Sequence, residues 1–377
     1  MTKRKNQKVI GHLLYNALPR VWRQLQKENE ITGIYKKKAR YITFMVYFIM
    51  MPLQFLQKII FNKKISKVDL SKQQPIFILG HWRSGTTHLH YLMHKDPQYG
   101  TLSNYQSFLF NVAHLSRSLL KIVLSPLMPS KRPQDNIRVS PDLPAEEEQP
   151  MSVLSTKSGI HSWNFPQNQS YFTKYNLFEG VSAKEKAEWG KDYHFLLQNI
   201  TFFNDGKQLV LKNPHNTSRI KELLELYPNA KFINLHRNPY DVIQSTRHLH
   251  KKIVQGQALQ FFSIKDREEM VLTQYKKTMQ KNIDELHLIP KENFVEVRFD
   301  DLEADSMKEM ERIYTTLGLP NFDKAKPKFE EYLSTVKNYK KNKFRHIRPE
   351  LIERINKEMK FVFDFYGYEL EEVNQAV

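Results

Sequence analysis

The chain contains no cysteine among its 377 residues. This absence excludes disulfide bonds, thiolate metal sites and a cysteine nucleophile. It fits a reducing compartment, and we expect the protein in the cytoplasm. The 14 histidines show no metal-ligand spacing. His88 and His90 stand two positions apart, so a helix would point them to different faces. We therefore expect no metal site.

Acidic residues are scarce relative to basic ones, with 40 Asp and Glu against 58 Lys and Arg, which gives a formal net charge of +18. Hydrophobic residues make up 40% of the chain, so a disordered chain is excluded. Such a charge often indicates nucleic-acid binding. No helix-turn-helix or RNA-binding motif is present, and the basic residues are not interleaved with aromatic ones on a recognisable module. The pattern therefore argues against nucleic acid as a partner.

Long hydrophobic runs are also absent, although residues 41–57 carry no charge. The run contains Pro52, Gln54 and Gln57, and a membrane-spanning helix needs about 20 apolar residues. It lies too far from the first residue, and lacks the cleavage site, for a signal peptide. Basic residues flank it, so a helix resting on an anionic membrane surface is one interpretation. A helix that covers the core with a solvated basic face is the other. We divide the chain into a basic, partly apolar helical segment (1–70) and an α/β domain (71–377).

The most informative stretch is residues 75–95. The apolar run Ile76–Leu79 predicts a buried parallel strand that stops at Gly80. A short turn with Arg83 and Gly85 follows, and a helical pattern opens at Thr86. A strand that leads through such a turn into a helix N-terminus gathers backbone N–H groups and the helix dipole around one spot. The stretch therefore predicts a binding site for a phosphorylated ligand.

This turn departs from the P-loop pattern G-x-x-x-x-G-K-[ST] at one important position. Gly80, Gly85 and Thr87 fit, but Thr86 occupies the lysine position and the cation is Arg83. A kinase needs that lysine and an acid for Mg²⁺, and no strand ends in a well-placed metal-binding Asp. A metal-bridged triphosphate is therefore not the expected ligand.

Residues 231–250 repeat the layout. A strand over 231–236 ends before Arg237, and a helix follows over 240–250. Arg237 suits a bidentate contact with phosphate, and Ser245 would offer a second hydrogen bond from the helix. The alternative for Arg237 is a surface ion pair with Asp241.

Together these two stretches resemble the nucleotide-binding motifs of the sulfotransferases. That family uses 3′-phosphoadenosine 5′-phosphosulfate (PAPS). The resemblance implies that the 5′-phosphosulfate is held by Arg83, Ser84, Gly85, Thr86 and Thr87, with Arg83 in place of the usual lysine. It implies that Arg237 and Ser245 bind the 3′-phosphate. The Arg-Ser-Gly-Thr-Thr motif is more similar to that of the broad, mainly bacterial group of sulfotransferase-like proteins than to that of the soluble animal enzymes. The resemblance extends from about residue 75 to 368.

Two more strands are expected at 208–212 and 294–299, and helices at about 216–227, 266–288, 306–317 and 349–366. Strands that alternate with helices predict an α/β fold with a P-loop-like parallel sheet, flanked by helices on both faces. Ligands bind such sheets beyond the carboxyl ends of the strands, where both motifs lie.

Sulfuryl transfer needs cations for the leaving group and a base for the acceptor's proton. A segment with six prolines, 125–150, predicts an irregular loop and ends with Glu146 and Glu148, two candidate bases. Members of the bacterial group commonly carry a Pro-x-Glu-x-Glu run here. His215 is the third candidate, since its spacing from Lys212 broadly resembles the Lys-x-His of soluble sulfotransferases. Lys212 is a candidate cation, or else an exposed lysine at a strand end; the glutamates are otherwise a solvated patch.

A basic loop at 337–345 falls where sulfotransferases place a segment that closes over the cosubstrate. Three lysines there are candidates for the 3′-phosphate, although a solvated charge run is the better interpretation: Lys340, Lys341 and Lys343.

The sequence thus predicts a metal-independent sulfotransferase that uses PAPS. The acceptor is left open among small molecules, glycans and lipids. An anionic membrane at the inner face of the cell is a candidate partner. The alternatives are a nucleotide kinase with an altered P-loop, and a non-catalytic membrane or nucleic-acid binding protein on the same fold.

Overall fold

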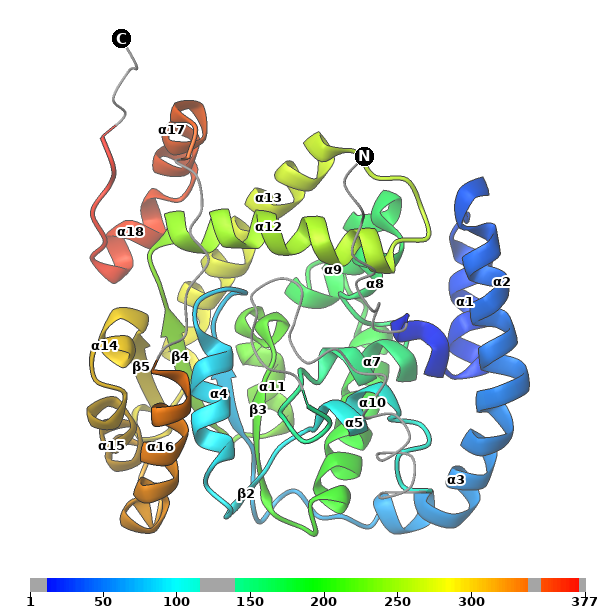
Figure 1. Ribbon diagram of the computed structural model, residues 1–377, viewed down its shortest axis with the longest axis horizontal. Helices are drawn as coiled ribbons and strands as arrows, with labels where there is room; N and C mark the ends of the chain where they lie inside the picture. Colours follow the sequence, from blue (N-terminus) through cyan, green and yellow to red (C-terminus); the bar gives the residue numbers. More distant parts are fainter. Residues whose placement is uncertain (1–11, 116–139, 338–346, 373–377) are drawn as a thin grey trace.

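The computed structural model of the chain describes residues 12–115, 140–337 and 347–372. Five parallel strands form one sheet in the order β2-β3-β1-β4-β5 (Figure 1). Their bounds are β1 (Ile76–Leu79), β2 (Tyr99–Gly100), β3 (Gln208–Lys212), β4 (Lys231–His236) and β5 (Phe294–Arg298). The four strands expected from the sequence are confirmed. The two-residue β2 was missed, because so short a strand carries no recognisable apolar run.

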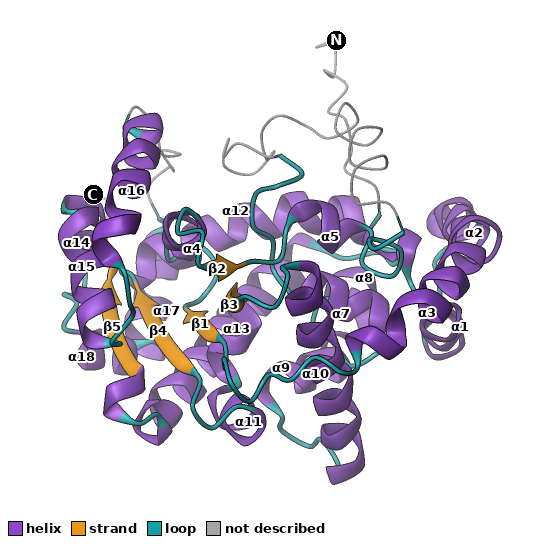
Figure 2. Ribbon diagram, turned by 90° about the horizontal axis from the view of Figure 1, so that it is seen from below, coloured by secondary structure: helices purple, strands orange, loops and turns teal. Residues whose placement is uncertain are grey.

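Helices connect the strands and cover both faces of the sheet (Figure 2). Those before β3 are α1 (Pro19–Glu28), α2 (Lys36–Phe44), the π-helix η3 (Met45–Met50), α3 (Met51–Ile65), α4 (Thr86–His94), α5 (Asn104–Phe108), α7 (Glu148–Leu154), α8 (His161–Asn164), α9 (Gln169–Leu177) and α10 (Ala183–Phe203). Those after β3 are α11 (Ile220–Leu226), α12 (Pro239–Gln257), α13 (Ile264–Glu285), α14 (Phe299–Ala304), α15 (Ser306–Thr316), α16 (Phe322–Val336), α17 (Pro349–Glu358) and α18 (Lys360–Tyr366).

Three local predictions need correction. The expected helix over 349–366 is two helices, because the chain breaks at Met359 between α17 and α18. The expected helix over 216–227 is a 3₁₀ turn at Pro214–Ser218 followed by α11. The proline-rich segment becomes helical at its end, since α7 begins at Glu148 with Pro150 in its first turn, where proline is tolerated.

The central strands are buried on both faces, because alternate side chains enter two different cores. Phe77 and Leu79 belong to a cluster with α10, α11 and residues before position 71. Ile76 and Ile78 belong to a second cluster with α4, α15 and α16. This two-sided burial explains why Ile76–Leu79 reads as a continuous apolar run, and it places the functional turn, residues 80–85, at the rim of a rigid sheet.

The N-terminal helices pack into the first of these clusters. Val21, Trp22 and Leu25 of α1 are fully buried, as are Ile42 and Val46 of the α2–η3 helix. The boundary at residue 70 stays a prediction; the described part of the N-terminal segment shares its core with strand β1.

Candidate active site

The turn between β1 and α4 has the backbone of an anion cradle. Gly80, Arg83 and Gly85 all have positive φ angles, of 141°, 73° and 97°. The Gly80 N–H donates to Thr217 Oγ1 at 2.9 Å, which fixes the start of the turn. The turn then runs into the first turn of α4, whose N–H groups have no acceptor within the helix. These N–H groups and the helix dipole favour a negatively charged ligand.

Two features require glycine at position 85: its positive φ angle and the close approach of the Phe299 ring. A Cβ at this position would lie 2.2 Å from Cδ2 of Phe299, the first residue of α14. The guanidinium of Arg237 lies 4.5 Å from the centroid of the same Phe299 ring. Phe299 therefore links the first motif to Arg237 at the end of β4. No pattern in the sequence singles out Phe299, which stood at the end of an expected strand.

Helix α12 brings the second motif onto the turn. Arg83 Nε donates to Ser245 Oγ at 2.7 Å, and Thr246 Oγ1 lies 3.4 Å from the carbonyl oxygen of Trp82. Ser245 is buried, while Arg237 keeps a side-chain exposure of 20% and pairs with Asp241 at 2.8 Å. The two predicted nucleotide motifs, 162 residues apart at Arg83 and Ser245, thus lie against each other.

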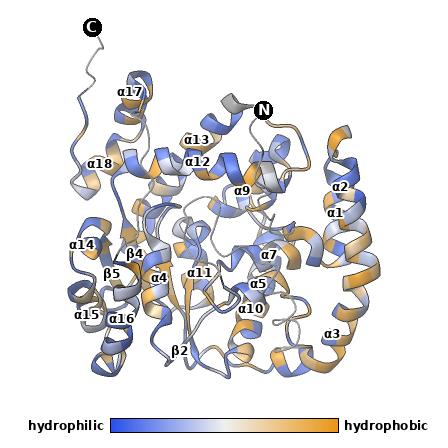
Figure 3. Ribbon diagram, viewed as in Figure 1, coloured by the Kyte–Doolittle hydropathy of each residue, from blue (hydrophilic) through white to orange (hydrophobic). Residues whose placement is uncertain are grey.

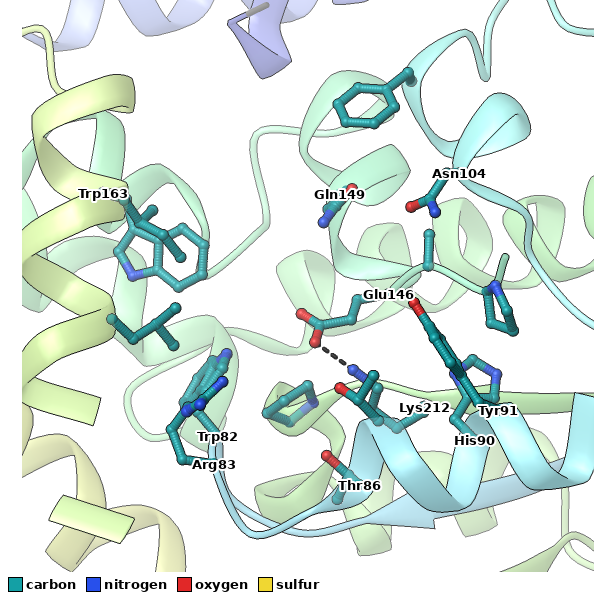
Figure 4. A pocket seen from close by; sticks show the side chains of 17 residues that line it. Trp82, Arg83, Thr86, His90, Tyr91, Asn104, Glu146, Gln149, Trp163 and Lys212 are labelled. Carbon is teal, nitrogen blue, oxygen red and sulfur yellow. Dashed lines mark hydrogen bonds and ion pairs between the residues drawn. The ribbon is translucent and has the colours of Figure 1, made fainter. Parts of the chain in front are cut away.

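A cavity of about 160 Å³ opens beside this junction, beyond the carboxyl ends of β1 and β3 (Figure 4). Its apolar walls come from Trp82, Tyr91, Phe108, Trp163, Leu249 and Ile253. Its polar lining includes Arg83, Thr86, Asn104, Glu146, Gln149 and Lys212. The cavity therefore joins the end of the anion cradle to a chamber lined by apolar and polar side chains in similar number.

Glu146 and Lys212 point toward each other in the middle of this cavity (Figure 4). Their side chains form a hydrogen-bonded ion pair, in which Lys212 Nζ donates to Glu146 Oε1. Lys212 ends strand β3 and is 3% exposed, so the interpretation as an exposed strand-end lysine is wrong. A carboxylate and an ammonium group therefore meet in the cavity wall. The carboxylate can accept a proton, and the ammonium group supplies a positive charge beside it.

The next two glutamates face away from the cavity into the protein. Glu148 is fully buried and accepts hydrogen bonds from Arg219 at 2.6 Å and from Asn213 Nδ2 at 2.9 Å. Burial alone would raise the pKa of Glu148, but the Arg219 guanidinium holds it well below its usual range. Glu147, also fully buried, accepts from Asn216 Nδ2 at 2.8 Å, and burial raises its pKa to about 8. The interpretation of this run as a solvated patch is therefore wrong.

His215 lies behind the cavity wall. Its ring packs edge-on against Trp82, with the centroids 4.7 Å apart, and its Nδ1 lies 3.1 Å from Asn213 Oδ1. Burial lowers the pKa of His215 to about 4, so the ring is neutral near pH 7. His215 does not line the cavity, although its neighbours Trp82 and Trp163 do.

Most of the predicted donor residues lie together: Arg83, Ser84, Gly85, Thr86 and Thr87 form one turn, and Arg237 and Ser245 adjoin it. Among the predicted catalytic residues, Glu146 and Lys212 meet in the cavity, whereas Glu148 and His215 lie outside it. Lys340, Lys341 and Lys343 fall outside the described residues. Within the described ranges, no group of three or more His, Asp or Glu side chains is arranged to hold a metal ion.

The sequence analysis did not single out three residues that line the cavity: Trp82, Tyr91 and Trp163. Trp82 was visible within the turn, but the sequence around Tyr91 and Trp163 carries no pattern that distinguishes a cavity wall from a core.

The chain is similar to known proteins over most of its length. Residues 75–324 match the Sulfotransferase family. The chain is 30% identical over 313 residues to omega-hydroxy-beta-dihydromenaquinone-9 sulfotransferase Stf3 of Mycobacterium bovis, which covers 83% of this chain and 80% of that protein. The protein of the same name from Mycobacterium tuberculosis matches equally.

Two solved structures share the fold. The sulfotransferase STF9 from Mycobacterium avium aligns with a TM-score of 0.70 at 16% identity, and the alignment covers 94% of this chain and 98% of that one. The sulfotransferase STF1 from Mycobacterium tuberculosis aligns with a TM-score of 0.56 at 18% identity, over 83% and 85% of the two chains.

Proposed function

Because this chain belongs to the sulfotransferase family, we propose that PAPS is its sulfuryl donor and that the turn at residues 80–87 and Arg237 bind the two ends of that nucleotide. Family membership confirms the prediction of a sulfotransferase over the nucleotide kinase and the non-catalytic binding protein. The donor itself and the residues that hold it are the proposal.

One contact carries the assignment of the donor site. Arg83 and Ser245, taken from two motifs that the sequence marks separately, are joined by a 2.7 Å hydrogen bond. The Phe299 ring contacts both Gly85 and the Arg237 guanidinium, which supports one ligand site shared by the two motifs. The 5′-phosphosulfate would lie on the turn and the first N–H groups of α4, and the 3′-phosphate would lie between Arg237 and Ser245.

We assign the general base to Glu146 and the leaving-group cation to Lys212. Glu146 lines the cavity, whereas Glu148 is held by Arg219 and His215 lies behind Trp82. In the transfer, an acceptor oxygen forms a bond to sulfur and gives its proton to Glu146. The bond from sulfur to the bridging phosphate oxygen breaks, and Lys212 stabilises the charge on the departing adenosine 3′,5′-bisphosphate.

For the acceptor we propose a hydroxylated lipid or a small molecule with a large apolar body. The aromatic and aliphatic part of the cavity wall supports this choice, because it offers a contact surface for an apolar body. The relative Stf3 is named for a hydroxylated menaquinone, a lipid-like acceptor. We place the reaction in the cytoplasm, in keeping with the cysteine-free composition.

The test is transfer from ³⁵S-labelled PAPS to a lipid extract and, separately, to an aqueous extract of host glycans. Label is expected in the lipid fraction with the unmodified protein and not with Glu146→Gln. Incubation with γ-³²P-labelled ATP and Mg²⁺ is the counterpart. Phosphate transfer without any ³⁵S transfer would overturn the assignment of the donor.

A further inference from the structure

The helix that runs from α2 through η3 to α3 exposes many large apolar side chains to solvent. Hydrophobic residues occupy much of its length, at the edge of the molecule (Figure 3). Those exposed by 40% or more are Tyr41, Phe44, Phe48, Ile49, Met51, Phe55, Leu56, Ile59 and Ile60, which we call the apolar face. Contiguous exposed apolar surface of this kind marks an interaction site.

Two uncharged polar residues of the same helix, Gln54 and Gln57, are buried against the protein. Gln54 is 7% exposed and donates from Nε2 to the carbonyl oxygens of Asn16, at 3.2 Å, and Ala17, at 3.1 Å. Gln57 is 4% exposed, donates to the carbonyl oxygen of Phe110 and accepts from the backbone N–H of His114. Both glutamines are thus taken up by the protein, and an apolar face remains on the outside. A helix merely covering the core would show the opposite arrangement.

Charge selects the kind of partner. There is no acidic residue between Glu30 and Asp69. The apolar face is bordered by exposed basic residues at both ends: Lys36, Lys37 and Arg40 before it, and Lys58, Lys63, Lys64 and Lys67 within or after it. A protein partner with an apolar surface has no need of such borders, whereas an anionic bilayer attracts them and takes up the apolar side chains between them.

The packing of the helix argues for a position on the bilayer surface. The stretch Gly33–Ile65 is long and apolar enough to span a membrane, and only 17% of its most apolar window is buried. Its inner side is nevertheless fixed, since Ile42 and Val46 are fully buried in the main core. Lys38 Nζ donates to the carbonyl oxygen of Ala258 at 3.2 Å. A spanning helix would have to abandon these contacts and bare Gln54 and Gln57 to lipid.

We propose that the apolar face of α2, η3 and α3 docks on an anionic lipid bilayer, with the helix parallel to the membrane plane and the α/β body in water. Gln57 of this helix donates to the carbonyl oxygen of Phe110, two residues beyond the cavity residue Phe108. This proposal stands on the exposed face and does not depend on the proposed donor or acceptor.

Sedimentation of the full chain with phosphatidylcholine vesicles, with and without phosphatidylglycerol, tests the docking. The double variant Phe55→Asp/Ile59→Asp is expected to lose binding by at least about tenfold, because two exposed apolar side chains that would enter the bilayer become charged. Phe365→Asp is the matched control, since Phe365 is half exposed but lies on α18, far from the docking helix (Figure 1). Equal binding of both variants would overturn the proposal.

A second pair of variants isolates the charge. Lys63→Gln/Lys64→Gln should weaken binding to the phosphatidylglycerol vesicles by about fivefold per lysine and leave binding to neutral vesicles unchanged. Lys326→Gln/Lys328→Gln on α16 removes two exposed lysines elsewhere and should have no effect.

Two further results would contradict the surface position. Retention on vesicles after alkaline carbonate extraction would indicate a spanning helix. A dimer in sedimentation equilibrium that Phe55→Asp/Ile59→Asp dissociates, without any vesicle binding, would assign the face to a second copy. Calorimetry with adenosine 3′,5′-bisphosphate separates these outcomes from a failure of the proposed function, because both docking variants should bind the nucleotide as the unmodified protein does.

Discussion

The two ends of the candidate active site handle charge in opposite ways. At the donor end, Arg83 and Arg237 are partly open to solvent; Arg83 donates to Ser245, and Arg237 pairs with the exposed Asp241. At the catalytic end, Lys212 is buried against Glu146, and a second buried pair, Glu148 with Arg219, lies behind it. The two arginines keep part of their surface in solvent, whereas the buried pairs are neutralised within the protein. Substitutions should therefore affect ligand affinity at the first end and chemistry or stability at the second.

The largest effect is expected at the cavity pair. Glu146→Gln keeps the size of the side chain but removes the proposed base, so kcat for ³⁵S transfer to lipid extract should fall about 10²–10⁴-fold. Calorimetry should show little change in affinity for adenosine 3′,5′-bisphosphate. Glu188→Gln, which removes an exposed carboxylate paired with Lys157, is the control and should leave kcat unchanged. A normal kcat for Glu146→Gln would transfer the role of base to another group.

The pair behind the cavity should show its importance in stability. Glu148→Gln leaves the buried Arg219 guanidinium without a counter-charge, and the free energy of unfolding should fall by about 3–5 kcal/mol. Denaturant unfolding measures this loss. Glu225→Gln breaks an exposed pair with Lys186 and should cost no more than about 1 kcal/mol. Equal losses in the two variants would remove the distinction between the buried pair and an ordinary surface pair.

At the donor end, the expected loss is one of affinity. Arg83→Ala and Arg237→Ala should each weaken binding of adenosine 3′,5′-bisphosphate about 10–100-fold, because each removes charge-assisted hydrogen bonds to phosphate. Unfolding curves should hardly change. Arg354→Ala removes a surface arginine on α17, which pairs with Glu269 and Glu358, and serves as the control. Wild-type affinity in both donor-site variants would refute the site.

A further effect, which appears only as the pH changes, concerns Glu147, the residue between Glu146 and Glu148. Burial raises its pKa from 4.5 to about 8, so the fold favours the protonated carboxyl group. The resulting stability is complete below pH 4.5 and is lost as the pH rises toward 8, by at most about 1.4 kcal/mol per pH unit. Glu147→Gln has no such proton to lose.

As the pH rises from 5 to 8, the free energy of unfolding of Glu147→Gln should therefore increase relative to that of the unmodified protein. The difference between the two curves isolates Glu147 from the buried histidines, which titrate in both proteins. Parallel curves would mean that Glu147 is ionised in the folded protein.

The donor end could be predicted from the sequence because its chemistry is local. A strand, a glycine turn and a helix N-terminus follow one another within a few residues, so Arg83, Gly85 and Thr86 were visible as a group. Alternation of strands and helices then placed Arg237 at the same edge of the sheet. The contact with Phe299 was not predictable, because it depends on how α14 leaves β5 and crosses the turn.

The catalytic end could be predicted only as a set of candidates. Glu146, Glu147 and Glu148 are consecutive, and sequence gives no rule for which of them faces the cavity. Two features decide which glutamate faces the cavity: α7 begins at Glu148, and Arg219, 71 residues away along the chain, forms an ion pair with Glu148. His215 was a reasonable candidate by spacing, but Trp82 separates it from the cavity.

The N-terminal helix was left open between membrane surface and core, and the missing information was orientation. Composition alone cannot distinguish an apolar helix that faces inward from one that faces outward. A signal was nevertheless present, since Gln54 and Gln57 stand three residues apart and so share one face of a helix. Two amides on the same face of an apolar helix indicate that this face packs against polar groups of the protein.

The left-handed backbone of Arg83, with its φ of 73°, implies a trade-off between durability and activity. Glycine adopts this conformation more readily than any residue with a side chain, so Arg83→Gly would relax the turn while removing the cation from it. Selection for stability alone would therefore favour glycine at position 83. If Arg83 binds the donor as proposed, a screen of this position for heat resistance should accordingly enrich variants with a relaxed turn and low sulfotransferase activity.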